Sequence, residues 1–103
     1  MDRGYLEQKI ISVLETVYDP EIPVNIYELG MIYNIKINDN ADVEIVMTLT
    51  SPACPVAESL PGEVREKVKT VDDVNEVNVE LVWEPPWNKD MMSEEAKLNL
   101  GFL

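Results

Sequence analysis

The chain has 103 residues, of which 46% are hydrophobic and 27% charged, a composition typical of one globular domain over residues 1–103 rather than of a disordered segment. Its 20 acidic and 8 basic residues give a net charge of −12, which opposes binding to the phosphates of nucleic acids or to anionic membranes. The N-terminus MDRGYLEQK is too charged for a secretory leader, no apolar run approaches the ~18 residues of a membrane span, and one cysteine cannot form an internal disulfide, so we expect a cytoplasmic protein.

The first predicted element is a helix that ends near Tyr18. Its apolar positions recur at helical spacing: Leu6, Ile10, Leu14 and Val17. The helix must stop there because Pro20 disfavours helical geometry in the residue before it. The segment DPEIPVNIYELG, residues 19–30, contains two prolines and ends in glycine. We therefore expect a loop with one short turn around residues 25–29 and Gly30 in a left-handed conformation.

Two strands follow, in MIYNIKIN and ADVEIVMTLT. Their odd-numbered residues are apolar: Met31, Tyr33, Ile35 and Ile37 in the first, Val43, Ile45, Met47 and Leu49 in the second. Both sets face one core only if paired residue numbers sum to an even number, which requires a hairpin loop of odd length. We expect three loop residues within 38–41, with Asn40 a candidate for positive φ. Thr48 and Thr50 then lie on the face opposite the core, next to the turn towards Cys54.

The second half of the chain predicts a helix, a strand and a short helix. Apolar residues recur every four positions at Val56, Leu60, Val64 and Val68, and they alternate with other residues at Val77, Val79, Leu81 and Trp83. Pro55 suits the first turn of the longer helix, and Pro61–Gly62 predicts a kink or a restart in it. Ser93 is the predicted N-cap of the last helix, and Gly101 ends it.

The element order α-β-β-α-β-α predicts the α+β class. We expect a two-layer sandwich with a small three-stranded mixed sheet and helices mainly on one face. The crossover from the second to the third strand is expected to be right-handed. The sequence does not decide whether the third strand lies beside the first or the second.

Cys54, in TLTSPACPVAE, is the chain's one thiol. A helix start and neighbouring hydroxyls favour the reactive thiolate, whereas nearby acids oppose it. The hydroxyls are those of Thr48, Thr50 and Ser51, and the acids are Asp19, Glu21 and Glu58. Because the chain has no histidine, a Cys–His mechanism is excluded. An inert packed cysteine and a reactive one both fit these residues.

Two other segments also allow two interpretations. Asp19 and Glu21 in DPE could be metal ligands or an acid–base pair, or could serve the turn only. The segment WEPPW could be an adaptable binding surface, or its tryptophans could lock the tail onto the sheet. A zinc or cluster site needs about four ligands. Any metal on Cys54 must therefore be shared with a second copy or a partner.

Three blocks, DPEIPVNIYELGMIY, MTLTSPACPVAESL and VELVWEPPWNKDMMSEEAKLNLG, together resemble the SufT/PaaD-like metal–sulfur cluster assembly family. The resemblance runs from about Tyr5 to Leu103, and the family is similar in fold to the C-terminal domain of NifU-type scaffold proteins. The site that it implies is formed by Asp19, Pro20, Glu21, Thr48, Thr50, Cys54 and Pro55, with a partner surface at Trp83, Pro86 and Trp87. Pro61–Gly62 departs from the family, whose helix usually continues there.

The resemblance implies an accessory factor in iron–sulfur cluster assembly or delivery, acting as carrier or adaptor through Cys54, and not an enzyme. Its cargo would be a transient iron–sulfur cluster or iron ion that the monomer does not bind stably. Its partners would be the assembly machinery and client apoproteins, and a homodimer is one way to share the cargo. The alternatives are a pure protein–protein adaptor without metal and a small thiol enzyme with Asp19 or Glu21 as base.

Overall fold

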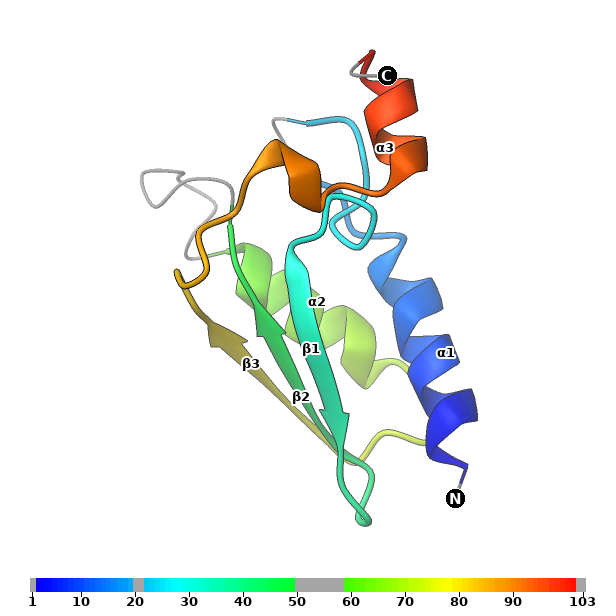
Figure 1. Ribbon diagram of the computed structural model, residues 1–103. Coiled ribbons are helices and arrows are strands. Elements are labelled where there is room, and N and C mark those ends of the chain that lie inside the picture. The colour runs from blue at the N-terminus through cyan, green and yellow to red at the C-terminus, as the bar shows by residue number, and fades with distance from the viewer. Residues whose placement is uncertain (1, 20–21, 50–58, 102–103) are drawn as a thin grey trace.

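The computed structural model describes residues 2–19, 22–49 and 59–101. Helices α1 (Arg3–Leu14) and α2 (Leu60–Lys69) cover one face of a three-stranded sheet, and α3 (Glu94–Asn99) lies beyond the end of the sheet at which β1 begins (Figure 1). The predicted α+β order is confirmed, with one added 3-10 helix, η2 (Lys89–Met91). No helix in the described ranges is long and apolar enough to cross a membrane.

The sheet is mixed, as predicted, in the order β1-β2-β3. β1 (Ile32–Ile37) runs antiparallel to β2 (Asp42–Met47), and β3 (Glu76–Leu81) runs parallel to β2. The structure thus places the third strand beside the second. Ile35 pairs with Ile45, so the predicted even sum of paired numbers is confirmed.

The β1–β2 hairpin places its positive φ at Ala41, with φ 63°, and not at Asn40. Asn38 and Asp42 pair through their backbones, which leaves the three loop residues that the parity argument required. The Asn38 side chain accepts hydrogen bonds from the N–H groups of Asn40 and Asp42 and holds the first part of the turn. In three-residue hairpins the left-handed residue is the last one. The prediction for Asn40 was therefore wrong by one position.

A β-bulge breaks the alternation of β1 at Tyr33. Ile32 pairs with Met47 and Asn34 with Val46, so Tyr33 is the extra residue. Its hydroxyl donates a hydrogen bond to the Pro85 carbonyl at 2.6 Å, and Tyr33 is not among the described residues that pack on the core. Bulges commonly re-aim a side chain in this way. The prediction that Tyr33 belongs to the core-facing set is wrong.

The core lies between the sheet and the two longer helices. Its fully buried members include Leu6, Ile10 and Leu14 from α1, Ile45 and Met47 from β2, and Val64 and Val68 from α2. α1 ends at Leu14, earlier than the predicted Tyr18, because Val17 turns back and donates its N–H to the Leu14 carbonyl. Val17 remains fully buried, as its place in the apolar pattern required.

α2 begins at Leu60, later than the start at Pro55 that the sequence suggested; Pro55 itself lies outside the described residues. Pro61 occupies the first turn, where its missing N–H removes no helical hydrogen bond. Of the two outcomes expected at Pro61–Gly62, a kink within the helix is therefore not seen.

The tail after β3 crosses the end of β2 and reaches the start of β1 (Figure 1). The Trp87 indole N–H donates to the Leu29 carbonyl at 2.7 Å, and the Ser93 N–H donates to the Glu28 carbonyl at 2.8 Å. The Ser93 side chain caps α3, and Gly101 follows it with φ 80°, as predicted. Hydrogen bonds thus fix the tail to the turn that precedes β1.

Gly30 lets the tail approach this turn. Its φ of 78° confirms the predicted left-handed conformation. A Cβ at this position would overlap the backbone carbonyl of Met91. Both the backbone conformation and the space therefore require glycine here.

We expect Gly30→Ala to lower the free energy of unfolding by more than about 3 kcal/mol, because left-handed strain adds to the displacement of Met91. Gly101→Ala is the matched control, since Gly101 has a similar φ but nothing within 4 Å of an added Cβ. It should cost only the strain, about 1 to 2 kcal/mol. Urea denaturation measures both, and equal losses would contradict the importance of the Met91 contact.

Candidate functional site

Backbone hydrogen bonds join the segments that the sequence proposed as a site. The Ile26 N–H donates to Val17 O at 2.8 Å, the Met31 N–H to Ile26 O at 3.2 Å, and the Thr48 N–H to Met31 O at 2.9 Å. This ladder links the end of α1, the turn before β1 and the end of β2. We call the region formed by Val17–Asp19, Met31 and Thr48 the site end of the sheet. Asp19 and Thr48 thus lie at the same end of the sheet.

Asp19 is 4% exposed at this end. Its carboxylate accepts a hydrogen bond from the Ile22 N–H at 3.2 Å, three residues further along the chain. An aspartate that accepts from a nearby backbone N–H holds a turn in place. This contact favours the turn interpretation of Asp19.

Thr48 is completely buried, and its hydroxyl lies 3.5 Å from the Leu49 carbonyl. A second hydrogen bond joins it to Tyr33, whose hydroxyl also approaches the Met91 sulfur at 3.5 Å. Burial raises the pKa of Tyr33 above 10.0; the charge of Glu84 raises that pKa further, and the Thr48 hydrogen bond lowers it in part. The Tyr33 hydroxyl therefore joins β1 to the tail, next to Thr48 at the end of β2.

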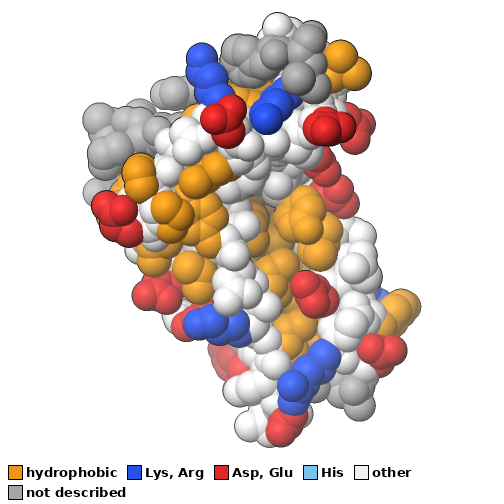
Figure 2. Space-filling model, in the orientation of Figure 1, with side chains coloured by type: hydrophobic (Ala, Val, Ile, Leu, Met, Phe, Trp, Pro, Cys, Tyr) orange, Lys and Arg blue, Asp and Glu red, His pale blue; other side chains and the backbone are white. Residues whose placement is uncertain are grey.

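The two tryptophans of the WEPPW segment differ: one locks the tail onto the fold, and the other is exposed as a binding surface would be. Trp87 is partly buried and bonded to Leu29, so it locks the tail. Trp83 is 40% exposed, and Pro86 is exposed as well. Hydrophobic side chains gather on the open face of the sheet and the tail, with acidic side chains at their margin (Figure 2). Only Trp83 and Pro86 of this set are therefore available for a partner.

The remaining predicted site residues, Pro20, Glu21, Thr50, Cys54 and Pro55, lie outside the described residues. Their convergence with Asp19 and Thr48 stays a prediction. Within residues 2–19, 22–49 and 59–101, no group of three or more histidine, cysteine, aspartate or glutamate residues could hold a metal ion.

Residues 7–81 match the family model described as iron–sulfur cluster assembly protein. The chain belongs to this family. It is 55% identical to a Fe-S protein maturation auxiliary factor of Porphyromonas gingivalis over 97 residues, which cover 94% of this chain and 92% of that protein. It is 38% identical to the Fe-S protein maturation auxiliary factor SufT of Staphylococcus aureus over 85 residues, 82% of this chain and 97% of that one.

A solved structure has the same fold. It is titled as a domain of unknown function, DUF59, from Bacillus anthracis, and it superposes with a TM-score of 0.90 at 40% identity over 97% of this chain and 95% of that one. The predicted resemblance to SufT-like iron–sulfur cluster assembly proteins is therefore confirmed in both sequence and fold.

Sequence reasoning missed Tyr33 as a residue of this family member's site end. The alternating pattern placed it in the core, and nothing in one sequence marks a bulge. The tail contacts at Leu29 and Met91 were also missed, because they join segments far apart in the chain. The two prolines after Trp83 predicted an extended tail, but they did not predict which part of the fold the tail contacts.

We expect Asp19→Asn to change the free energy of unfolding by less than about 0.5 kcal/mol, because an amide oxygen can still accept from the Ile22 N–H. Asp19→Ala should cost about 1 kcal/mol because this acceptor is lost. Denaturant midpoints of the two variants measure the difference. A large loss with Asn would mean that the negative charge, rather than the turn, is what the fold requires.

Tyr33→Phe should lower the free energy of unfolding by about 1 kcal/mol at neutral pH, because the hydrogen bond to Pro85 is lost. The raised pKa means that the folded protein binds the Tyr33 proton more tightly than the unfolded chain does. The stability that this proton contributes is therefore present below pH 10.0 and is lost as the pH rises through the higher pKa of the folded state. The difference in free energy of unfolding between wild type and Tyr33→Phe should therefore shrink above pH 10.0. Urea denaturation across this range measures it, with Tyr5→Phe as the control, and a difference that stays constant would contradict the prediction.

Proposed function

We propose that this protein is an accessory factor in the maturation of iron–sulfur proteins that acts through Cys54. The observation that carries the proposal is the family match over residues 7–81, which includes the chain's one cysteine. The names of two relatives as maturation auxiliary factors support a role beside the enzymes of the pathway. The absence of any histidine to activate the thiol supports a non-catalytic role.

The cargo in this proposal is an iron–sulfur cluster or an iron ion that passes through the protein. A cluster takes about four protein ligands, and this chain supplies one thiolate and no imidazole. A partner, a second copy or a client must therefore complete the site. Holding a cluster by one Fe–S(Cys) bond suits transfer, because one incoming thiolate from the acceptor replaces one departing thiolate.

The partner surface in this proposal is narrower than the sequence suggested. Trp83 and Pro86 are exposed and can contact a client or the assembly machinery. Trp87 acts indirectly, since its bond to Leu29 holds the tail that presents the other two. Exposed aromatic anchors of this kind commonly dominate the energy of protein interfaces.

A second candidate is an adaptor that bridges proteins without binding cargo. The contacts of Asp19 and Thr48 favour it, because both side chains are buried and engaged within the protein rather than presented to a metal. In the adaptor, Trp83 and Pro86 carry the function and the thiol does not.

Anaerobic reconstitution with iron, sulfide and a small thiol separates the two candidates. Wild type should take up iron and sulfide and pass them to an apoprotein acceptor, whereas Cys54→Ser should do neither. The carrier role requires a thiol that partners can reach, and a hydroxyl is tolerated at such a position, so the free energy of unfolding of Cys54→Ser is expected to stay within about 0.5 kcal/mol of wild type. Glu66→Gln, which changes an exposed residue of α2 outside the candidate site and keeps the thiol, is the control for uptake.

Three outcomes would contradict the carrier role. Equal uptake by Cys54→Ser would show that the thiol is not a ligand. Full complementation of a maturation defect by Cys54→Ser, with no uptake by either protein, would favour the adaptor. A clear loss of stability with maturation retained would mean that Cys54 serves only the fold.

A further inference from the structure

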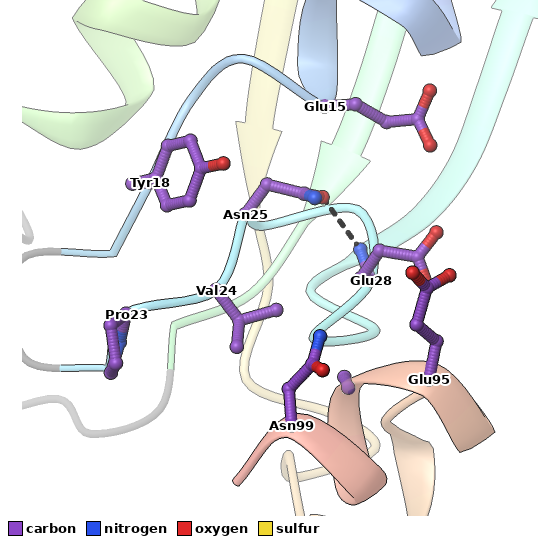
Figure 3. A pocket seen from close by; sticks show the side chains of 9 residues that line it. Glu15, Tyr18, Pro23, Val24, Asn25, Glu28, Glu95 and Asn99 are labelled. Atoms are coloured by element: carbon purple, nitrogen blue, oxygen red, sulfur yellow. Dashed lines mark hydrogen bonds between the residues drawn. The ribbon is translucent and has the colours of Figure 1, made fainter.

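A pocket of about 250 Å³ lies where the end of α1, the turn before β1 and α3 meet (Figure 3). Its floor is apolar and buried, made by Val24 and Ala96. One wall carries the Tyr18 ring, which is 56% exposed although the Tyr18 backbone is paired with Asn25. Large aromatic rings usually lose more of their surface in a folded domain. The exposed ring therefore has a face available for a ligand.

Three glutamates from separate segments also line the pocket. Glu15 follows α1, Glu28 lies in the turn before β1 and Glu95 lies on α3, and all three side chains line the pocket (Figure 3). Among the described residues, the ion pairs found involve other carboxylates. These three charges are thus not neutralised within the described part of the chain.

The chemistry of the pocket selects an organic cation over a metal ion. In the described part of the chain no three carboxylates come close enough to ligate one ion. The volume is also several times the ~30 Å³ that one water occupies. A guanidinium group fits better: it is planar, stacks on an aromatic ring and offers five donors to separate acceptors.

We propose that this pocket receives an arginine side chain of a partner protein. The guanidinium donates to the carboxylates of Glu28 and Glu95, and the methylene stem lies on Val24 and Ala96. The Tyr18 ring, on the opposite side of the pocket in Figure 3, packs against the rest of the bound residue. Charge complementarity carries the choice of partner, because a chain of net charge −12 attracts a basic surface. The arginine pocket does not include Cys54, so its test is independent of the test of the cargo role.

Two small probes of similar shape, one cationic and one neutral, test the proposal on the full chain. N-acetyl-arginine methylamide should shift the NMR signals of the Tyr18 ring and of the Asn25 and Asn99 side-chain amides, all of which line the pocket. The neutral isostere, N-acetyl-citrulline methylamide, should bind more weakly by about 5-fold or more. Glu28→Gln and Tyr18→Leu should each weaken arginine binding about 3-fold or more.

Glu66→Gln is the matched control. Glu66 is an exposed glutamate on α2, so its substitution removes the same charge at a position outside the pocket. It should leave arginine binding unchanged. An equal loss with Glu66→Gln would assign the attraction to the overall charge, and equal binding of citrulline would remove the role of charge. Either result, or no saturable shift at the pocket residues, would overturn the proposal. Backbone spectra that match wild type establish that each variant is folded.

Discussion

The approach of the tail to the turn before β1 is the contact on which the rest of the structure depends. It requires a residue without Cβ at Gly30, because the Met91 carbonyl occupies that space and φ is positive there. Once the backbones are this close, Trp87 reaches the Leu29 carbonyl and Ser93 reaches Glu28. One missing methyl group thereby allows the tail to pack against the turn before β1 and to position α3 beside it.

The described members of the candidate site, Asp19 and Thr48, are buried. Asp19 holds its turn through Ile22, and Thr48 is enclosed by Tyr33 and its own neighbour Leu49. Leu49 and Leu60, on either side of the segment that contains Cys54, are both buried in the core.

The two proposed partner surfaces differ in their chemistry. Trp83 and Pro86 extend the tail with exposed apolar groups. The pocket at Tyr18, Glu28 and Glu95 combines an aromatic ring with carboxylates. An accessory factor gains specificity from such a division, because apolar anchors supply affinity while charge excludes wrong partners. Both surfaces are built on elements that the tail contact holds together.

The sequence by itself determined the elements, the even-sum register of the hairpin, the left-handed Gly30, the Ser93 cap and the family. Each of these follows from local spacing, from the backbone freedom of one residue, or from motifs that can be read in order. Only the tertiary structure decided that β3 lies beside β2, that Tyr33 leaves the core and that Trp87 bonds to Leu29. The physical reason is that strand order, a bulge and a tail contact depend on groups distant in the chain, whose meeting is set by packing and not by the pattern of any one segment.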